Sequence, residues 1–548
     1  MRSLVARLLL PVGLATVVVL GLASATADAP GEHQPSATRP ASGDHQSAVP
    51  SASAELAATR VGPRPVTAAA FPGRPHLLLL VLDELPGDSL LGPDGSIDAG
   101  RYPNFAELAA DSTWFRNAYS TYDSTTKAVP LILDGLRPVE GSEPDRHWHP
   151  RSIFTALGKR GYRIVAAEEA TALCSPSLCR GGRARRPAIM PRLLRGRPER
   201  FARFVRSIRP SARPTFWMKH VLLPHGPYLY LPSGARTRSG PRDLIPEMNS
   251  TLGSHDEYLT RHNEQRYLLQ LGFMDRLLGR VLRRLKAAGI YDDTTIVLTA
   301  DHGFAWQVGV ATRRSVSTSN IHELTTVPLL VKRPGQVAAH TSGAYAQTLD
   351  VTPTIADVLG VRLGYRTDGR SVFSRAVRRR RGVGVTTRDF SAIVHISGRR
   401  WRARREAVVR RRLRQLGWGD WQSLYTGIGP HRELLGRRVA GMARAAAGGL
   451  RASIAGASAF DRVNRPGGIV PAQVAGTLHG DGTSGSGRPI AVAVNGRIEG
   501  VGRTFQLAGR AGEHYGVNVP EAALGNGTNV VEVFEITPTG ELRSLARA

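Results

Sequence analysis

The chain has 548 residues, of which 41% are hydrophobic, and it carries a formal net charge of +29 at neutral pH. This length and apolar content predict a globular protein of two to four domains with a sizeable buried core. They exclude a chain that is disordered throughout. An isoelectric point near 11.2 indicates anionic partners, among which nucleic acid is the usual first interpretation.

The N-terminus has the pattern of an export signal. Arg2 and Arg7 precede an apolar segment at 8–25, and small residues at 23–29 suit cleavage. The apolar segment is also just long enough to cross a bilayer, so residues 1–29 are expected to be a signal peptide or a membrane anchor. Both alternatives predict an extracytoplasmic protein, secreted or membrane-anchored, and make a nucleic-acid partner unexpected. Residues 30–74 are rich in Ala, Ser, Pro and Gly and are expected to form a disordered tether.

Two apolar segments end in polar residues that can bind a metal ion. The first begins at His76 and ends in Asp83 and Glu84, and the second begins at Thr294 and ends in Asp301 and His302. Each has the length and composition of a strand buried on both faces. Parallel strands of an open α/β sheet bring such residues to one edge, where ligands bind. Carboxylates and an imidazole together predict a divalent-metal site.

A candidate nucleophile lies between these strands. Thr125 and Thr126 stand at the start of the apolar segment that ends at Gly135, as in a strand-to-helix turn that presents a hydroxyl group. Another expected strand leads from Thr215 to a loop that contains His225 between two prolines.

Taken in order, these motifs resemble the sulfatase and alkaline-phosphatase superfamily, including its phosphoethanolamine-transferase and lipoteichoic-acid-synthase-like members. The resemblance covers about residues 75–373 and rests on the following segments: 83–84, Pro103-Asn-Phe-Ala-Glu-Leu-Ala-Ala, Phe115-Arg-Asn-Ala-Tyr-Ser, Pro224-His-Gly-Pro227, Thr299-Ala-Asp-His-Gly303, and Val327-Pro-Leu-Leu-Val with Pro334-Gly. It implies an α/β catalytic domain whose alkaline-phosphatase-like sheet is sandwiched by helices.

The resemblance also suggests a nucleophile. Sulfatases carry Cys or Ser in Cys-x-Pro-Ser-Arg, oxidised to formylglycine, at a fixed distance before Thr-Gly, and counting back from Gly135 gives Thr125. No Cys or Pro-Ser-Arg stands there, so a Thr nucleophile is implied instead of formylglycine. Pro176-Ser177 imitates the sulfatase motif, but Leu178 stands where Arg is required, and we interpret it as a chance match.

The remaining site residues follow from the same resemblance. One divalent cation (Ca, Mn, Mg or Zn) is expected on Asp83, Asp301 and His302, with Glu84 as a fourth ligand. A single ion is favoured over two because residues 304–320 contain no further histidine that could bind a second ion. His225 is expected to be catalytic. The expected substrate contacts are His220, His322 and Lys127. The alternative for His220 is a structural histidine, for His322 an ordinary loop histidine, and for Lys127 a solvent-facing lysine.

The rest of the chain yields three expectations. Cys174 and Cys179, the two cysteines, are expected to form a disulfide, with two free thiols as the alternative. Residues 374–464 are expected to be an Arg-rich helical connecting region. Its positive charge either contacts an anionic membrane or wall polymer, or it only forms a solvated face. Residues 465–548 alternate apolar and polar positions and predict a small β-sandwich without catalytic residues, with a hairpin turn at Asn495-Gly496.

These features predict an extracytoplasmic, metal-dependent hydrolase or transferase that acts on a phosphate or sulfate ester of the cell envelope through Thr125. The alternative is a non-catalytic cell-envelope protein that keeps the fold as a binding scaffold.

Overall fold

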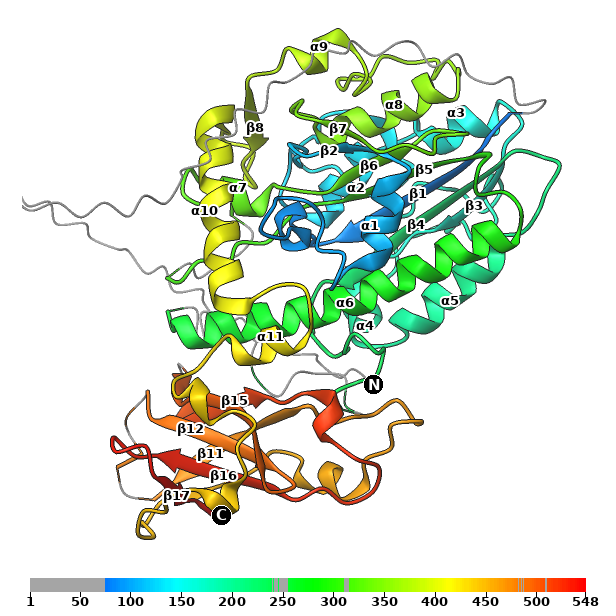
Figure 1. The fold of residues 1–548 in the computed structure, drawn as a ribbon. Coiled ribbons are helices and arrows are strands. Elements are labelled where there is room, and N and C mark those ends of the chain that lie inside the picture. Colours follow the sequence, from blue (N-terminus) through cyan, green and yellow to red (C-terminus); the bar gives the residue numbers. More distant parts are fainter. Residues whose placement is uncertain are drawn as a thin grey trace, which may run out of the picture. The chain divides into compact units, whose positions relative to one another are not determined.

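The computed structural model describes residues 74–548 except 239, 241–244, 246–254, 310–314, 481, 484, 486 and 508–509. Its centre is a seven-stranded sheet with the order β3-β4-β1-β5-β6-β2-β7 (Figure 1). The strands are β1 (His76–Asp83), β2 (Thr113–Phe115), β3 (Arg163–Ala167), β4 (Thr215–Pro224), β5 (Thr294–Ala300), β6 (Leu329–Lys332) and β7 (His340–Ser342). Pairing is parallel from β3 to β5, whereas β6 runs antiparallel to both β5 and β2. Every residue of β1, β4 and β5 is buried, as the apolar segments predict.

Helices cover both faces of this sheet. In Figure 1, α1, α5 and α6 lie on one face and α2, α3 and α8 on the other. The helices of this part are α1 (Pro103–Ala110), α2 (Thr125–Asp134), α3 (Ile153–Gly158), α4 (Ile189–Leu194), α5 (Arg197–Ser207), α6 (Glu257–Ala287), α7 (Ile321–Leu324) and α8 (Val351–Val358), with the 3-10 turns η1 (Gly87–Leu90) and η2 (Thr348–Asp350). The predicted α/β class, with helices on both sides of the sheet, is confirmed.

Local sequence explains the two helices nearest the site. Pro103 occupies the first turn of α1, where a missing N–H costs no hydrogen bond. Helix α2 starts after Ser124, whose backbone is extended, and ends at Gly135, whose φ of 72° is the left-handed conformation that glycine adopts without strain.

The Arg-rich region contains a hairpin as well as helices. Its elements are α9 (Arg375–Arg378), β8 (Gly382–Thr386), β9 (Ile393–Ser397), α10 (Gly398–Leu416) and α11 (Gln422–Thr426), followed by the 3-10 turns η3 (Arg432–Leu434), η4 (Val439–Gly441) and η5 (Ala457–Arg462). The arginines at 399–414 differ in exposure. Those at 399, 400, 402, 410 and 414 are exposed, Arg404 and Arg411 are half-buried, and Arg405 and Arg412 are buried. The buried arginines of α10 therefore attach this helix to the catalytic part, whereas the exposed ones present charge to solvent. Contact with an anionic polymer stays a prediction.

Two further sheets form the C-terminal part, in agreement with the predicted β-rich module. The first has the order β14-β15-β11-β10-β18 and the second β13-β12-β16-β17. Their strands are β10 (Arg451–Ala452), β11 (Gln473–His479), β12 (Pro489–Val494), β13 (Arg497–Arg503), β14 (Phe505–Leu507), β15 (Arg510–Asn518), β16 (Val531–Ile536), β17 (Leu542–Ser544) and β18 (Ala546–Arg547), with the turn η6 (Glu521–Ala523). Asn495-Gly496 joins β12 to β13, and both residues have positive φ, as a two-residue hairpin requires.

Polar contacts join this module to α6. The Tyr258 hydroxyl donates to the Gly516 carbonyl at 2.8 Å, and Arg503 Nη2 donates to Asp256 Oδ1 at 3.0 Å. Asn518 Nδ2 donates to Gln265 Oε1. The expected domain boundaries themselves stay predictions.

The expected membrane anchor requires a correction. Among the described residues of 74–548, we find no helix that is long and apolar enough to cross a bilayer. The apolar segment on which the expectation depended, within 1–29, lies outside the described residues, as does the tether at 30–73. We therefore withdraw the predicted localisation.

Candidate metal centre and nucleophile

The carboxyl ends of β1 and β5 lie side by side because the two strands pair in parallel, with Leu82 opposite Ala300. Asp83 and Asp301 thus meet at one edge, both buried. Asp301 Oδ1 accepts the backbone N–H groups of Glu84 at 3.1 Å and His302 at 2.7 Å. Its second oxygen, Oδ2, is buried and has no hydrogen bond within the described residues. An ionised carboxylate oxygen held this way is suited to bind a cation.

His302 presents one defined nitrogen to the same space. Its Nδ1 lies 2.9 Å from the Gly303 carbonyl oxygen, so the proton is on Nδ1 and the lone pair on Nε2. This is the arrangement that orients a histidine for a metal ion. His302 Nε2 lies 3.7 Å from Asp301 Oδ2.

Thr125, the first residue of α2, directs its hydroxyl group at this cluster. Its Oγ1 lies 3.5 Å from Asp83 Oδ1 and also 3.5 Å from His302 Nε2. The side chain of Thr125 is buried, whereas the neighbouring Thr126 is half-buried. The structure therefore brings the predicted nucleophile within reach of two predicted metal ligands.

Two overlapping groups of side chains could hold a metal ion. One consists of Asp83, Glu84 and His302, and the other of Asp83, His220 and Asp301. Within each group the ligand atoms all lie within 4.8 Å of one another, and every member is buried. The mixture of carboxylates and imidazoles fits a divalent cation such as Zn²⁺ or Mn²⁺. All four predicted metal ligands thus meet, although their role in binding stays a prediction.

His225 lies beside Glu84, with 3.4 Å between its Nε2 and Glu84 Oε1. Its other nitrogen, Nδ1, lies 2.7 Å from the Gly226 carbonyl oxygen. Two residues that sequence reasoning missed hold this loop. The buried Arg197 donates to the carbonyl oxygens of Leu222, His225 and Pro227, and Gln270 Nε2 donates to those of Pro224 and His225. Arg197 is the first residue of α5 and Gln270 lies within α6, and no local sequence motif marks either residue.

His220 lies inside the site rather than at its rim. Residue 220 is opposite Val81 in the β1–β4 pairing, and its ring is fully buried. Its Nε2 lies 3.8 Å from Asp83 Oδ2. Burial lowers the pKa of His220 to about 4, despite the opposing effect of Asp301.

The other two predicted substrate contacts are engaged elsewhere. The Lys127 ammonium donates to the Val139 carbonyl at 3.1 Å, to the Ser142 hydroxyl at 2.8 Å and to the Ser142 carbonyl. His322 Nε2 lies 3.8 Å from Glu323 Oε1. Burial, followed by the charge of Arg404, lowers the pKa of His322 to about 4. These partners are not members of the Asp83 cluster, and the roles of Lys127 and His322 in substrate binding stay predictions.

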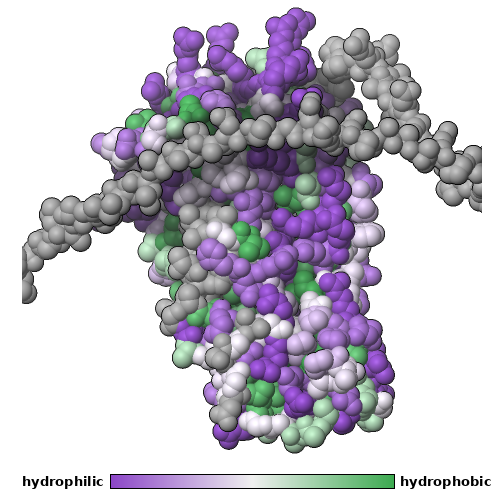
Figure 2. Space-filling model, turned by 90° about the vertical axis from the view of Figure 1, so that its left-hand side faces the viewer, coloured by the Kyte–Doolittle hydropathy of each residue, from purple (hydrophilic) through white to green (hydrophobic). Residues whose placement is uncertain are grey.

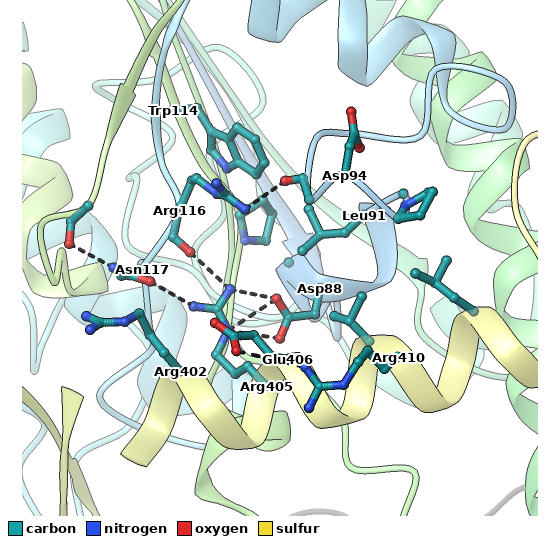
Figure 3. Close-up of a pocket in the computed structure, with 18 of the residues that line it drawn as sticks. Asp88, Leu91, Asp94, Trp114, Arg116, Asn117, Arg402, Arg405, Glu406 and Arg410 are labelled. Atoms are coloured by element: carbon teal, nitrogen blue, oxygen red, sulfur yellow. Dashed lines mark hydrogen bonds and ion pairs between the residues drawn. The ribbon is translucent and has the colours of Figure 1, made fainter. Parts of the chain in front are cut away.

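A separate cavity of about 610 Å³ lies between η1 and α10. Figure 3 shows Arg405 reaching from α10 toward Asp88, and its guanidinium also donates to Asn117 Oδ1 and to the Arg116 carbonyl oxygen. Trp114 and Arg116 form one wall, and the Arg116 guanidinium lies 5.3 Å from the indole centroid. Figure 2 shows that hydrophobic side chains on the visible face are scattered among hydrophilic ones rather than gathered in one patch.

The predicted disulfide agrees with the structure. Cys174 and Cys179 form a disulfide pair with 5.9 Å between their Cα atoms, and no cysteine is free.

A family model described as "Sulfatase" matches residues 75–361, which is more than half of the chain. The chain belongs to the sulfatase family. It therefore belongs to the superfamily that the sequence motifs resemble, and that prediction is confirmed.

Relatives of this family match only in part. The Extracellular sulfatase SULF-1 homolog of Drosophila melanogaster is 33% identical over 147 residues, which cover 27% of this chain and 13% of that protein. The N-sulphoglucosamine sulphohydrolase of Homo sapiens is 38% identical over 93 residues, 16% of each chain. Among solved structures, the phosphonate monoester hydrolase of Agrobacterium radiobacter is 18% identical, with a TM-score of 0.43, and covers 58% of this chain and 81% of that one. This chain thus spans less than a fifth of the two curated relatives it matches here.

Proposed function

We propose that this protein is a metal-dependent hydrolase or transferase of sulfate or phosphate esters that uses Thr125 as its nucleophile. The observation that carries the proposal is the position of Thr125 Oγ1, 3.5 Å from both Asp83 Oδ1 and His302 Nε2. A cation held by Asp83 and His302 would lie next to this hydroxyl group and would activate it as a nucleophile. Asp83, Glu84, Asp301 and His302 would hold this cation.

The bound cation would lower the pKa of the Thr125 hydroxyl and neutralise charge on the sulfuryl or phosphoryl group. Thr125 then loses its proton to water, and its oxygen forms a bond to sulfur or phosphorus while the bond to the leaving ester oxygen breaks. Water, or an acceptor alcohol in a transferase, attacks the same atom in a second step and releases Thr125. Two easier steps thus replace one difficult step.

His225 is suited to protonate the leaving oxygen. Its Nδ1 contact with the Gly226 carbonyl leaves Nε2 as the nitrogen that faces the site, 3.4 Å from Glu84 Oε1. When the ring is protonated, Nε2–H is the available donor, and the Glu84 carboxylate stabilises its charge. Arg197 and Gln270 hold the loop that sets this direction.

The names of matched relatives support the ester class. They include, besides the extracellular sulfatase homolog named above, a Multifunctional alkaline phosphatase superfamily protein of Trinickia caryophylli, 34% identical over 119 residues that cover 23% of that protein. Sulfate and phosphate esters both present a tetrahedral anion, so one cation and one nucleophile can serve either ester.

The deciding experiment measures turnover by the full chain, loaded in parallel with Zn²⁺, Mn²⁺ or Ca²⁺, of aryl sulfate, aryl phosphate, phosphodiester and aryl phosphonate substrates. We expect turnover of at least one ester, lost on chelation and restored by the metal. Arg410→Ala, on the exposed face of α10, is the matched control and should keep the wild-type rate. Metal-loaded protein that turns over none of the esters would overturn the proposal and favour the binding-scaffold alternative.

A further inference from the structure

The β8–β9 hairpin brings two runs of arginines together. One run, 378–381, precedes β8, and the other, 399–402, follows β9. Gly382 lies opposite Ser397 in this antiparallel pair, and the Gly398 N–H donates to the Arg381 carbonyl at 2.8 Å. Figure 2 shows hydrophilic side chains projecting from the top of the view, where Figure 1 draws α9. Six exposed arginines gather at this end of the hairpin, and we call them the arginine corner: Arg378, Arg379, Arg381, Arg399, Arg400 and Arg402.

The arginine corner carries positive charge that carboxylates of the chain do not neutralise. Among the ion pairs of the described residues, none includes a member of the corner, whereas Arg380 and Arg405 each bind a carboxylate. The two acidic residues of segment 375–414 are engaged elsewhere: Asp389 accepts from Ser391, and Glu406 pairs with another arginine of α10. Six like charges held together repel one another, and an anionic partner would remove this repulsion.

The helix dipole of α10 adds to the positive potential of the corner. Arg399 and Arg400 lie in the first turn of this 19-residue helix, which contains no acidic residue. A helix N-terminus already carries partial positive charge, so cations there are unfavourable for the helix and favourable for a bound anion. Guanidinium groups bind sulfate and phosphate groups through two parallel hydrogen bonds. The corner is therefore suited to several sulfate or phosphate groups at once.

The other end of the same hairpin contacts the segment that carries the proposed nucleophile. The Thr386 N–H donates to the Thr121 carbonyl at 3.1 Å, and the Tyr122 hydroxyl donates to the Arg388 carbonyl at 2.8 Å. Each strand of the hairpin has five residues. About 16 Å of extended chain thus separates the arginine corner from the residues that precede Thr125.

A flexible polymer fits this arrangement better than a lipid surface does. Thr125 is only 9% exposed, so a flat bilayer resting on the corner could not reach its hydroxyl group. A polymer strand can bind at the corner and still enter a buried site about one hairpin length away.

The side chains around the corner also favour a polysaccharide over a nucleic acid. Proteins bind single-stranded nucleic acids by stacking the bases on exposed aromatic rings. The two large aromatic side chains of the hairpin and α10 do not offer such a surface, because Trp401 is fully buried and Phe390 packs against Tyr122. Exposed polar side chains of the hairpin, such as Ser391 and His395, are suited to sugar hydroxyl groups.

We propose that the arginine corner binds an anionic polysaccharide that carries sulfate or phosphate groups, and that this polymer runs along β8–β9 toward Thr125. All six arginines lie outside 75–361, so this surface is not part of the family match. Binding at the corner requires no metal and no reaction. Only the presentation of a polymer ester to Thr125 rests on the proposed function.

The first test measures binding of the full chain to dextran sulfate and to unsulfated dextran of the same length, at low and high salt. We expect binding to dextran sulfate alone, weakened by salt. A variant with Arg379→Ala, Arg381→Ala and Arg400→Ala should bind about tenfold more weakly or worse. The matched control, with Arg276→Ala, Arg280→Ala and Arg283→Ala, removes the same charge from exposed positions of α6 and should keep its affinity within about threefold. Equal losses in the two variants would show that only net charge matters and would overturn the corner.

Two further ligands test the choice of partner in the same assay. They are a single-stranded oligothymidylate and vesicles of phosphatidylglycerol. We expect the chain to bind both more weakly than dextran sulfate, and tighter binding of either would overturn the assignment to a polysaccharide.

The path along the hairpin is tested by inhibition. Dextran sulfate should inhibit turnover of the small aryl ester competitively, and the corner variant should need about tenfold more polymer for the same inhibition while its kcat and KM for the aryl ester stay unchanged. Binding of the polymer without inhibition would overturn the path. An enzyme that binds dextran sulfate at the corner but turns over no ester would overturn the proposed function and leave the binding surface in place.

Discussion

Arg405 of α10 holds Asp88 in a two-point ion pair, with Nη2 2.6 Å from Oδ1 and Nε 2.9 Å from Oδ2. Both side chains are about nine-tenths buried. Asp88 lies on η1, five residues after Asp83, so a residue from outside the matched family region supports the segment that follows the candidate metal ligands.

This pair predicts a large effect of removing one partner. Arg405→Ala leaves the buried Asp88 carboxylate uncompensated and should lower the free energy of unfolding by about 3 kcal/mol. Arg410→Ala is the control, because its side chain is 62% exposed and lies 4.0 Å from Glu406; its effect should stay within about 0.5 kcal/mol. Chemical denaturation measures both. Equal effects of the two substitutions would contradict the role of the pair.

The nucleophile assignment distinguishes two adjacent threonines. Thr125→Ala should lower kcat by about a thousandfold or more while metal binding and folding persist, because it removes the group that forms the covalent ester. Thr126→Ala should lower kcat much less, since its hydroxyl is not among the contacts of the cluster. Mass spectrometry of a trapped sulfated or phosphorylated peptide locates the site, and modification at residue 126 would refute the assignment.

Metal binding should depend on Asp301. Asp301→Ala removes a buried carboxylate at the cluster, and metal content by elemental analysis should fall by at least half. Asp275→Ala is a suitable control because this carboxylate, also buried, accepts hydrogen bonds from Asn104 and from the Phe105 backbone on α1. It should lose stability but retain its metal. Full metal content in the Asp301 variant would sink the proposed site.

The disulfide should contribute to stability rather than to chemistry. Closing so short a loop as that between Cys174 and Cys179 is worth about 2 kcal/mol. Cys174→Ser should therefore lower the free energy of unfolding by about this amount and leave kcat of the folded enzyme unchanged. Peptide mapping without reduction should recover the linked pair, and two alkylated thiols in the native protein would contradict the pairing.

Acid stability should depend on Glu169. Burial raises the pKa of this carboxyl, but Lys219, Arg200 and Arg192 outweigh burial and lower it to about 2, below the ordinary value of 4.5. Between these values the unfolded chain binds more protons than the folded one, so stability falls as pH drops from 4.5 toward 2. Glu169→Gln should flatten the profile of unfolding free energy in this window while lowering stability at pH 7. An unchanged acid slope would show that other carboxyls control it.

Local patterns in the sequence determined much of the catalytic part. Continuous apolar segments predict buried strands with polar ends, and parallel strands of one sheet end at the same edge, so Asp83 and Asp301 could be expected to meet. Pro103, Gly135 and Asn495-Gly496 mark element ends because their backbone preferences operate within a few residues, without help from the rest of the fold.

Only the tertiary structure decided how individual side chains are used. Lys127 has the position of a substrate contact in the sequence but donates to Val139 and Ser142, while Arg405 has the pattern of a solvated charge but is buried against Asp88. His220 could not be placed beside Asp83 from sequence, because the contact depends on the pairing of β1 with β4, strands more than a hundred residues apart. Sequence periodicity determines which face a residue takes within its element, whereas the partner of a buried charge is determined by packing between elements that are distant in the chain.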